Sequence, residues 1–274
     1  MNPIQHLLLV LAVLCFSIGL RTFQNRFLHR LGSLGIVVTS FLAGWLLGGS
    51  PVVGAVFALS WFFLPWLEIL TRVRRMRLPV ERTLRHRTPP NRQIFPMFDE
   101  LSDAVESSGF EYGADTGWDW AEYRQFYRVY VDGTRRAQAS ICLVEQSDLA
   151  FYYVSISSRD RKGNVFVTWN YPFSYGLKIA PRLHLCRADG ELDCALLVER
   201  HEAFLLSRGV KVEDLAEPSA ETIETEIQGD IRSQIVHNLD CGLLKRDGTE
   251  MIRYSVRGMF FLWFQFLRDM VRLS

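Results

Sequence analysis

The sequence predicts a membrane-anchored α+β protein: three N-terminal transmembrane helices, then a cytoplasmic domain whose antiparallel sheet of four or more strands is packed by helices. Three observations support this prediction. Three apolar runs fill the first 70 residues, and four strand-like segments with short links follow later. Residues 1–92 hold eleven Arg, no Lys and two acids, for a net charge of +9, whereas residues 93–274 carry −8. The chain therefore joins two parts of different character.

The apolar runs lie at residues 4–20, 31–47 and 52–70 and form the predicted anchor, residues 1–70. A helix needs about 20 residues to cross the hydrocarbon core, and about 17 at the least. The Gly-Gly-Ser-Pro sequence after the second run allows a tight hairpin turn. We interpret the first run as a retained helix rather than a signal peptide, because no Lys or Arg begins it and no Ala-x-Ala precedes Arg21.

The arginines beside the predicted helices set the expected orientation. None precedes the first helix, three lie between the first and second, none lies in the hairpin turn, and eight follow the third. Cytoplasmic segments carry the excess of basic residues. The pattern therefore predicts an N-terminus outside and the whole chain after residue 70 in the cytoplasm, in a multi-pass protein of a bacterial-type inner (plasma) membrane.

A connector at residues 71–94 is rich in arginine. The candidate membrane-surface residues here are Arg72, Arg74, Arg75 and Arg77, because anionic headgroups attract each nearby cation by about 1 kcal/mol. Interspersed apolar residues predict that this stretch continues the third helix along the surface. We do not expect nucleic acid as a partner, since the acidic domain that follows opposes such a footprint.

Residues 95–215 predict an α+β domain. A first helix begins at Pro96 and ends before Gly109, and a second runs from about residue 191 to 207 with Asp189 as its cap and Gly209 as its C-terminal glycine. Short links between the strand-like segments permit only antiparallel neighbours. The aromatic residues along them suit a sheet that is covered on one face. The predicted strands are 125–132, 137–145, 149–157 and 165–170.

Residues 216–274 are expected to belong to the same domain. Apolar residues spaced four apart from Ile223 to Leu239 predict a helix that ends at Gly242, and Asp247-Gly248 predicts the turn of a small hairpin. The final segment, 259–267, is apolar apart from Gln265 and is too short to span a membrane.

A helix that is apolar nearly all round is buried in protein or in lipid. Three placements of segment 259–267 stay open: on the domain's own core, in the headgroup layer or against the spanning helices, and in a groove of a partner protein. The second placement makes Trp263, Arg268 and Arg272 candidate membrane-surface residues.

The sequence shows no residue that we assign as catalytic, cofactor-binding or metal-ligating. No dinucleotide, phosphate-loop, zinc-protease or nucleophile-elbow motif occurs. The spacing of His184, Cys186, Cys194 and His201 matches no zinc pattern. His237 and Cys241 lie four apart, on one face of a helix, and we interpret them as packing residues. Segment 115–120, Asp-Thr-Gly-Trp-Asp-Trp, is interpreted as a solvated loop with aromatic anchors rather than the lining of a polar pocket.

The leading functional hypothesis is a non-catalytic, membrane-anchored interaction or scaffold protein, such as a subunit of a membrane complex. One alternative is a ligand- or lipid-sensing domain with a pocket between sheet and helices, and another is an enzyme acting on a membrane-associated substrate. The expected partners are the lipid bilayer and other membrane proteins or a second copy. A cavity lined by convergent polar groups favours the alternatives, and an exposed apolar patch favours the scaffold.

Overall fold

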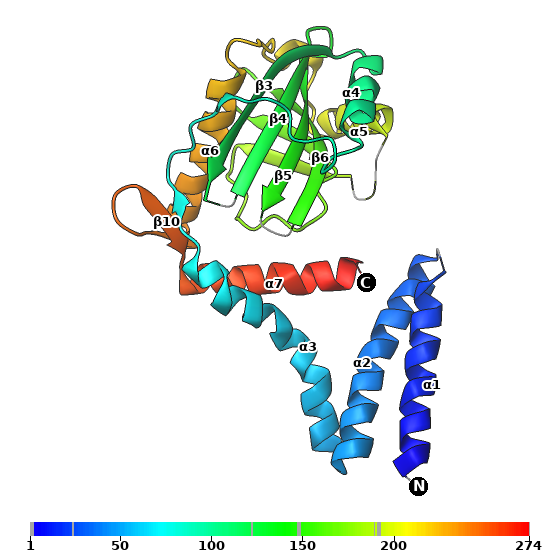
Figure 1. Ribbon diagram of the computed structural model, residues 1–274. Coiled ribbons are helices and arrows are strands. Elements are labelled where there is room, and N and C mark those ends of the chain that lie inside the picture. The colour runs from blue at the N-terminus through cyan, green and yellow to red at the C-terminus, as the bar shows by residue number, and fades with distance from the viewer. Residues whose placement is uncertain are drawn as a thin grey trace. The chain divides into compact units, whose positions relative to one another are not determined.

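The computed structural model describes residues 3–23, 25–121, 123–146, 149–188, 190 and 193–273. Contacts between Cα atoms divide the chain into a helical unit, Met1–Met76 with Val256–Ser274, and a domain, Arg77–Ser255. The predicted α+β class is confirmed, because three long apolar helices precede a domain with a multi-stranded sheet (Figure 1).

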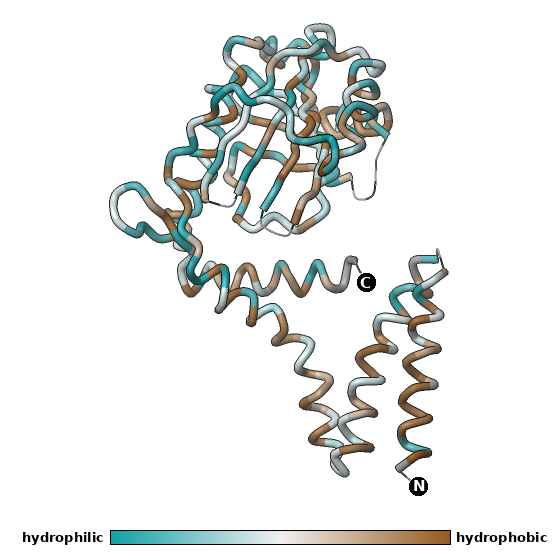
Figure 2. Tube along the Cα trace, in the orientation of Figure 1, coloured by the Kyte–Doolittle hydropathy of each residue, from teal (hydrophilic) through white to brown (hydrophobic). Residues whose placement is uncertain are grey.

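Three helices of the helical unit match the predicted apolar runs. Each is long and apolar enough to cross a membrane, and Figure 2 shows them as mostly hydrophobic along their length. The helices are α1 (Pro3–Arg21), α2 (Arg26–Gly48) and α3 (Pro51–Thr71).

The turn between α2 and α3 follows from its residues. Gly49 adopts φ +68°, a left-handed conformation that glycine takes at no steric cost. The Ser50 side chain then caps α3 by accepting a hydrogen bond from Val52 N at 3.2 Å. The two helices approach closely beside this turn, since a Cβ atom added at Gly54 would lie 2.6 Å from the carbonyl oxygen of Phe41.

The prediction that the connector continues the third helix is wrong. After Thr71 comes a short 3₁₀ turn, η1 (Val73–Arg75), and then two short strands, β1 (Leu78–Pro79) and β2 (Arg85–His86). Pro79 accounts for the extended backbone at β1, because proline cannot continue a helix and biases the residue before it toward extended backbone. Both strands belong to sheets of the domain, with β1 pairing with β10 and β2 with β3.

The main sheet has the strand order β2-β3-β4-β5-β6-β7-β8. Neighbouring strands are antiparallel except β7 and β8, which are parallel. The predicted meander is confirmed as β4 to β7. The longer strands are β3 (Glu111–Trp120), β4 (Tyr123–Asp132), β5 (Ala137–Gln146), β6 (Leu149–Arg159), β7 (Val165–Trp169) and β8 (Leu183–Arg187).

The prediction of a solvated loop at residues 115–120 is wrong, because this segment forms the second half of β3. Its two aspartates obscured the alternation that marks a strand. Asp115 is buried and receives two hydrogen bonds from Arg128, at 2.8 Å and 2.7 Å, while Trp118 is buried on the opposite face. The ion pair with a neighbouring strand therefore allows a carboxylate at a strand position.

The sheet is covered on both faces rather than on one. Figure 1 shows α4 (Phe98–Ser107) and α5 (Cys194–Ser207) on one side and α6 (Ile223–Asp240) on the other. Successive residues of a strand point to opposite faces, and both sets are apolar in the central strands. Under α4 and α5 lie Phe126, Tyr130, Ile141, Leu143, Val154 and Ile156, and under α6 lie Tyr127, Val129, Cys142, Val144 and Tyr153.

The helix boundaries follow from their caps. Helix α4 begins at Phe98, two residues after the predicted start, and Gly109 follows it with φ +93° as predicted. Helix α5 is capped by Asp193, whose carboxylate accepts a hydrogen bond from Ala195 N at 2.9 Å. The predicted cap Asp189 and the predicted start at residue 191 lie outside the described residues. Helix α6 ends before Gly242, as predicted.

A smaller sheet, of order β1-β10-β9, packs against the second half of α6. Its strands β9 (Leu244–Arg246) and β10 (Met251–Tyr254) form the predicted hairpin, with Gly248 at φ +82° in the turn. The last helix, α7 (Val256–Leu273), contains the aromatic segment and groups with the N-terminal helices.

Candidate functional site

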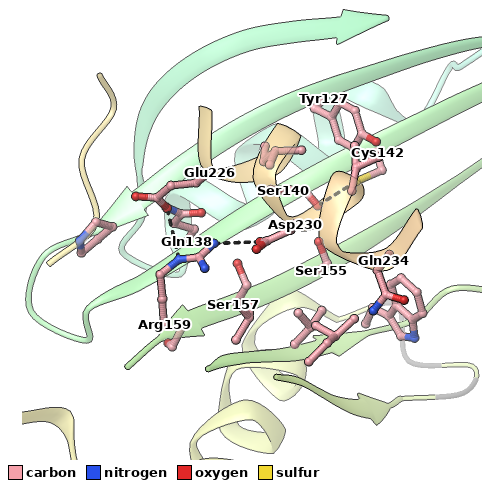
Figure 3. A pocket seen from close by; sticks show the side chains of 18 of the residues that line it. Tyr127, Gln138, Ser140, Cys142, Ser155, Ser157, Arg159, Glu226, Asp230 and Gln234 are labelled. Atoms are coloured by element: carbon pink, nitrogen blue, oxygen red, sulfur yellow. Dashed lines mark hydrogen bonds and ion pairs between the residues drawn. The ribbon is translucent and has the colours of Figure 1, made fainter. Parts of the chain in front are cut away.

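A cavity of about 200 Å³ lies between the main sheet and α6 (Figure 3). Strands β4 to β7 form its floor and the first half of α6 covers it. A water molecule occupies about 30 Å³ of liquid, so the cavity has room for roughly seven waters or one small ligand. Lining side chains include Tyr127, Gln138, Ser140, Cys142, Tyr153, Ser155, Ser157, Arg159, Trp169, Tyr175, Glu226, Asp230 and Gln234.

The floor of the cavity is polar at its centre. Gln138 and Ser140 alternate along β5, and their cross-strand partners on β6 are Ser157 and Ser155. Among the described residues, no protein group forms a hydrogen bond with the hydroxyl of Ser140 or Ser157. Sheet positions beneath a covering helix usually carry apolar side chains, so these hydroxyls are available to a ligand or to water.

One end of the cavity is ionic. Arg159 Nη2 donates to Asp230 Oδ2 at 2.8 Å, and Arg159 Nε lies 3.6 Å from Glu226 Oε2. Gln138 Nε2 donates to the same Glu226 oxygen at 3.3 Å. Burial raises the pKa of Asp230, and the neighbouring guanidinium of Arg159 opposes that shift. Two carboxylates and one guanidinium leave this end with a formal charge of −1.

The other end of the cavity is aromatic. Tyr153 and Trp169 meet edge to face with ring centroids 5.9 Å apart, and Tyr175 lies 5.6 Å from Trp169. Burial raises the pKa of Tyr153 well above its ordinary value and the pKa of Cys142 to about 12. Phenol and thiol are therefore both neutral, and Cys142 is not activated as a nucleophile.

A buried histidine joins the opposite face of the sheet to α5. His201 is 2% exposed, with Nδ1 3.0 Å from Thr168 Oγ1 and Nε2 3.1 Å from Ser158 Oγ. Burial lowers its pKa to about 4, so the ring is neutral and can donate through one nitrogen and accept through the other. Because substrate cannot reach it, the group is a structural bridge between helix and sheet.

The predicted membrane-surface arginines fall in both units. Arg72, Arg74 and Arg75 are exposed at the end of α3, and Arg72 pairs with Glu68 at 3.4 Å. Arg77 belongs to the domain, where it is half-buried and forms an ion pair with the hairpin residue Asp247.

The predicted residues of α7 lie beside α3 or in solvent. Trp263 is half-buried, and its indole N–H donates to the carbonyl oxygen of Phe62 at 2.7 Å. Trp66 packs between the two helices, with its ring centroid 5.0 Å from that of Phe260. Arg268 is exposed, and the side chain of Arg272 lies outside the described ones. The structure thus brings Trp263 to a candidate spanning helix.

The histidines and cysteines considered as metal ligands are spread over several elements. His184 stacks on Phe166 at 4.9 Å, and Cys194 is buried at the start of α5. Cys241 Sγ lies 3.5 Å from His237 Nε2, on one face of α6 as their spacing implies. In the part of the chain that the structure describes, no three potential ligands gather where a metal ion could bind.

Comparison with protein-family models, with curated proteins and with solved structures found no match. The cavity is therefore interpreted from its chemistry alone. The sequence suggested a pocket between sheet and helices as one alternative, but its residues were not identified, although a signal was present. Gln138 and Ser140 alternate with alanine and isoleucine on β5, and Ser155 and Ser157 alternate with Val154 and Ile156 on β6. This double alternation indicates a polar patch on one face of the sheet, and the structure places α6 over that face.

Proposed function

We propose that this chain is a membrane-anchored binding protein whose cytoplasmic domain takes up a small polar ligand in the cavity beneath α6. The observation that carries the proposal is the pair of half-buried hydroxyls, Ser140 and Ser157, on the floor of the cavity, which have no hydrogen-bond partner among the described residues. A scaffold has no need of such a cavity, because polar groups placed under a covering helix reduce its packing. The cavity therefore favours ligand recognition over a purely structural role.

The arginine pattern supports the proposed arrangement in a bacterial-type plasma membrane. Three helices are able to span it, and the exposed arginines Arg72, Arg74 and Arg75 follow the third one. Basic residues gather on the cytoplasmic side. We therefore place the N-terminus outside and the domain in the cytoplasm.

Helix α7 is proposed to lie in the cytoplasmic headgroup layer. Phe260 and Phe264, one turn apart, are 54% and 61% exposed, so they form an apolar stripe that a bilayer would cover. Arg268 is exposed near its end, and Trp263 connects the helix to α3. Aromatic and basic residues together are typical of an interfacial helix.

A topology experiment tests the arrangement. A reporter that is active only outside should work when fused after residue 50 and fail after residue 95, and a cytoplasmic reporter should give the opposite result. Export of a reporter fused after Asn91 would contradict the proposed orientation.

A ligand screen tests the binding role. The full chain in nanodiscs is melted in the presence of a broad panel of small polar compounds, and binding is scored as a saturable rise in melting temperature. A ligand at 100 times its Kd stabilises the folded state by about 2.7 kcal/mol. The matched variant Ser157→Leu places an apolar side chain in the cavity and should abolish the rise. A panel without a single saturable response would contradict the proposal.

A further inference from the structure

We propose that the cavity beneath α6 recognises a neutral cyclic polyol about the size of one monosaccharide or cyclitol. This inference rests on the proposed function and adds the chemical class of the ligand. It follows from the charges, the hydrogen-bonding groups and the size of the cavity, each of which comes from named residues of the domain.

Carboxylates outnumber guanidiniums in the lining, which disfavours an anionic ligand. The guanidinium of Arg159 faces Asp230 and Glu226. Arg136 Nη1 donates to three backbone carbonyls, the shortest bond being 2.8 Å to Leu215 O. With Glu217 exposed at the edge, the lining carries three carboxylates against two guanidiniums. The lining therefore carries a formal charge of −1, which opposes the uptake of a phosphate or a carboxylate.

A cationic ligand is also disfavoured, because the nearest carboxylates have partners. Glu226 accepts from Gln138 through one oxygen and from Thr222 Oγ1, at 2.9 Å, through the other. Asp230 pairs with Arg159 through Oδ2. Asp230 Oδ1 accepts no hydrogen bond from another described residue. It can therefore accept a hydrogen bond from a ligand hydroxyl.

The remaining groups suit ligand hydroxyls. A hydroxyl both donates and accepts, and so do the serine hydroxyls of Ser140 and Ser157 that have no partner in the described protein. Figure 3 shows these serines and Ser155 on the strands around Asp230 of α6. Several hydroxyls in a row, facing one carboxylate oxygen, match a ligand that carries hydroxyls on neighbouring carbons.

The size and the aromatic end indicate a ring. A cavity of about 200 Å³ has room for roughly seven waters, which suits one small ring. The rings of Tyr153, Trp169 and Tyr175 provide an apolar wall against which the C–H face of a polyol can pack. Ligand pockets usually combine such a wall with a few placed polar groups.

The experiment uses the full chain in phosphatidylcholine nanodiscs, with melting temperature as the readout. The probes are glucose and myo-inositol as neutral cyclic polyols, and inorganic phosphate, glutamate and choline as charged compounds. We expect a saturable rise with at least one polyol and none with the charged compounds. Removing one hydroxyl, in Ser140→Ala or Ser157→Ala, should weaken polyol binding about three- to tenfold, the equivalent of one hydrogen bond. Ser207→Ala, at an exposed position of α5 on the other side of the sheet, is the matched control and should bind as the wild type does.

A second arm separates a free polyol from a lipid headgroup. Nanodiscs that contain a monoglucosyl lipid replace free glucose, and a rise in melting temperature that Ser157→Ala reduces would assign the headgroup as the source. A response to the free polyol alone would assign a soluble compound. Either result supports the ligand class.

Two results would overturn the ligand class. A saturable rise with phosphate, glutamate or choline that is lost in Ser157→Leu would leave the cavity as a binding site and show that the class is wrong. Failure of glucose, myo-inositol and the glucosyl lipid to shift the wild-type melting temperature would also overturn the class, while the broad panel above decides the binding role separately. Because each binding assay begins with a folded protein that melts cooperatively, a variant that fails to fold is recognised before it is scored.

Discussion

Lowering the pH should destabilise the domain through His201. The imidazole is buried between Thr168 and Ser158, and burial lowers its pKa from the ordinary 6.5 to about 4. Between these two pH values the unfolded chain binds a proton at His201 that the folded chain does not. Stability is therefore fully present above about pH 6.5 and falls as the pH drops toward 4.

The magnitude follows from the size of the shift. A difference of one pKa unit corresponds to about 1.4 kcal/mol, so a shift from 6.5 to about 4 removes about 3 kcal/mol from the free energy of unfolding. That is a large share of the 5–15 kcal/mol that is typical of a folded domain. Below about pH 4 both states are protonated at this site, and His201 should cause no further loss.

The assay is urea unfolding of the full chain in detergent, followed by circular dichroism of the sheet, at several pH values from about 7.5 to 4. His201→Gln is the matched variant, because an amide keeps one donor and one acceptor but does not titrate in this range. The wild type should lose about 3 kcal/mol more than the variant over this interval. Subtracting the variant removes the contribution of carboxylates such as Asp230. Parallel pH profiles that agree within about 1 kcal/mol would refute the reasoning.

Two further predictions concern packing and charge. Gly54→Ala should destabilise the helical unit by about 1–3 kcal/mol, because the new Cβ would lie 2.6 Å from a backbone carbonyl oxygen. Gly19→Ala, where a Cβ would have nothing within 4 Å, should be neutral or stabilising. Melting both variants in detergent checks this, and equal effects would contradict it. Asp115→Ala should lower the free energy of unfolding in urea by about 3–5 kcal/mol, because it leaves Arg128 unpaired in a largely buried site. Glu81→Ala, which removes an exposed ion pair with an N–O distance of 3.6 Å, should lower it by less than about 1 kcal/mol. Similar losses in the two variants would show that burial does not determine how much an ion pair stabilises this domain.

The sequence by itself determined the features that depend on local patterns. Three apolar runs of sufficient length predicted α1, α2 and α3, because a helix satisfies its own backbone and needs only a continuous apolar stretch to suit a membrane. Alternation and short links predicted the meander of β4 to β7. Glycines such as Gly109 and Gly242 marked helix ends, because their left-handed backbone conformation is a property of one residue.

Features that depend on a distant partner were decided only by the tertiary structure. Strand β3 carries two aspartates, and Asp115 fits a strand only because Arg128 of β4 pairs with it. The connector became strands because β10 and β3 offered edges to it. Trp263 could have packed on any apolar surface, and it contacts α3 through the carbonyl oxygen of Phe62.

The cavity shows the same division between local pattern and tertiary contact. Ser140 and Ser157 are polar residues at alternating strand positions, a pattern that equally suits a face turned to solvent. The tertiary structure makes the difference, because α6, which begins some 65 residues after Ser157, lies over that face, and the two serines line a cavity together with Asp230. Burial is a relation between a residue and the element packed on it, so one strand's sequence does not contain it. The polar pattern was present in the sequence, but only the covering helix turned it into a candidate site.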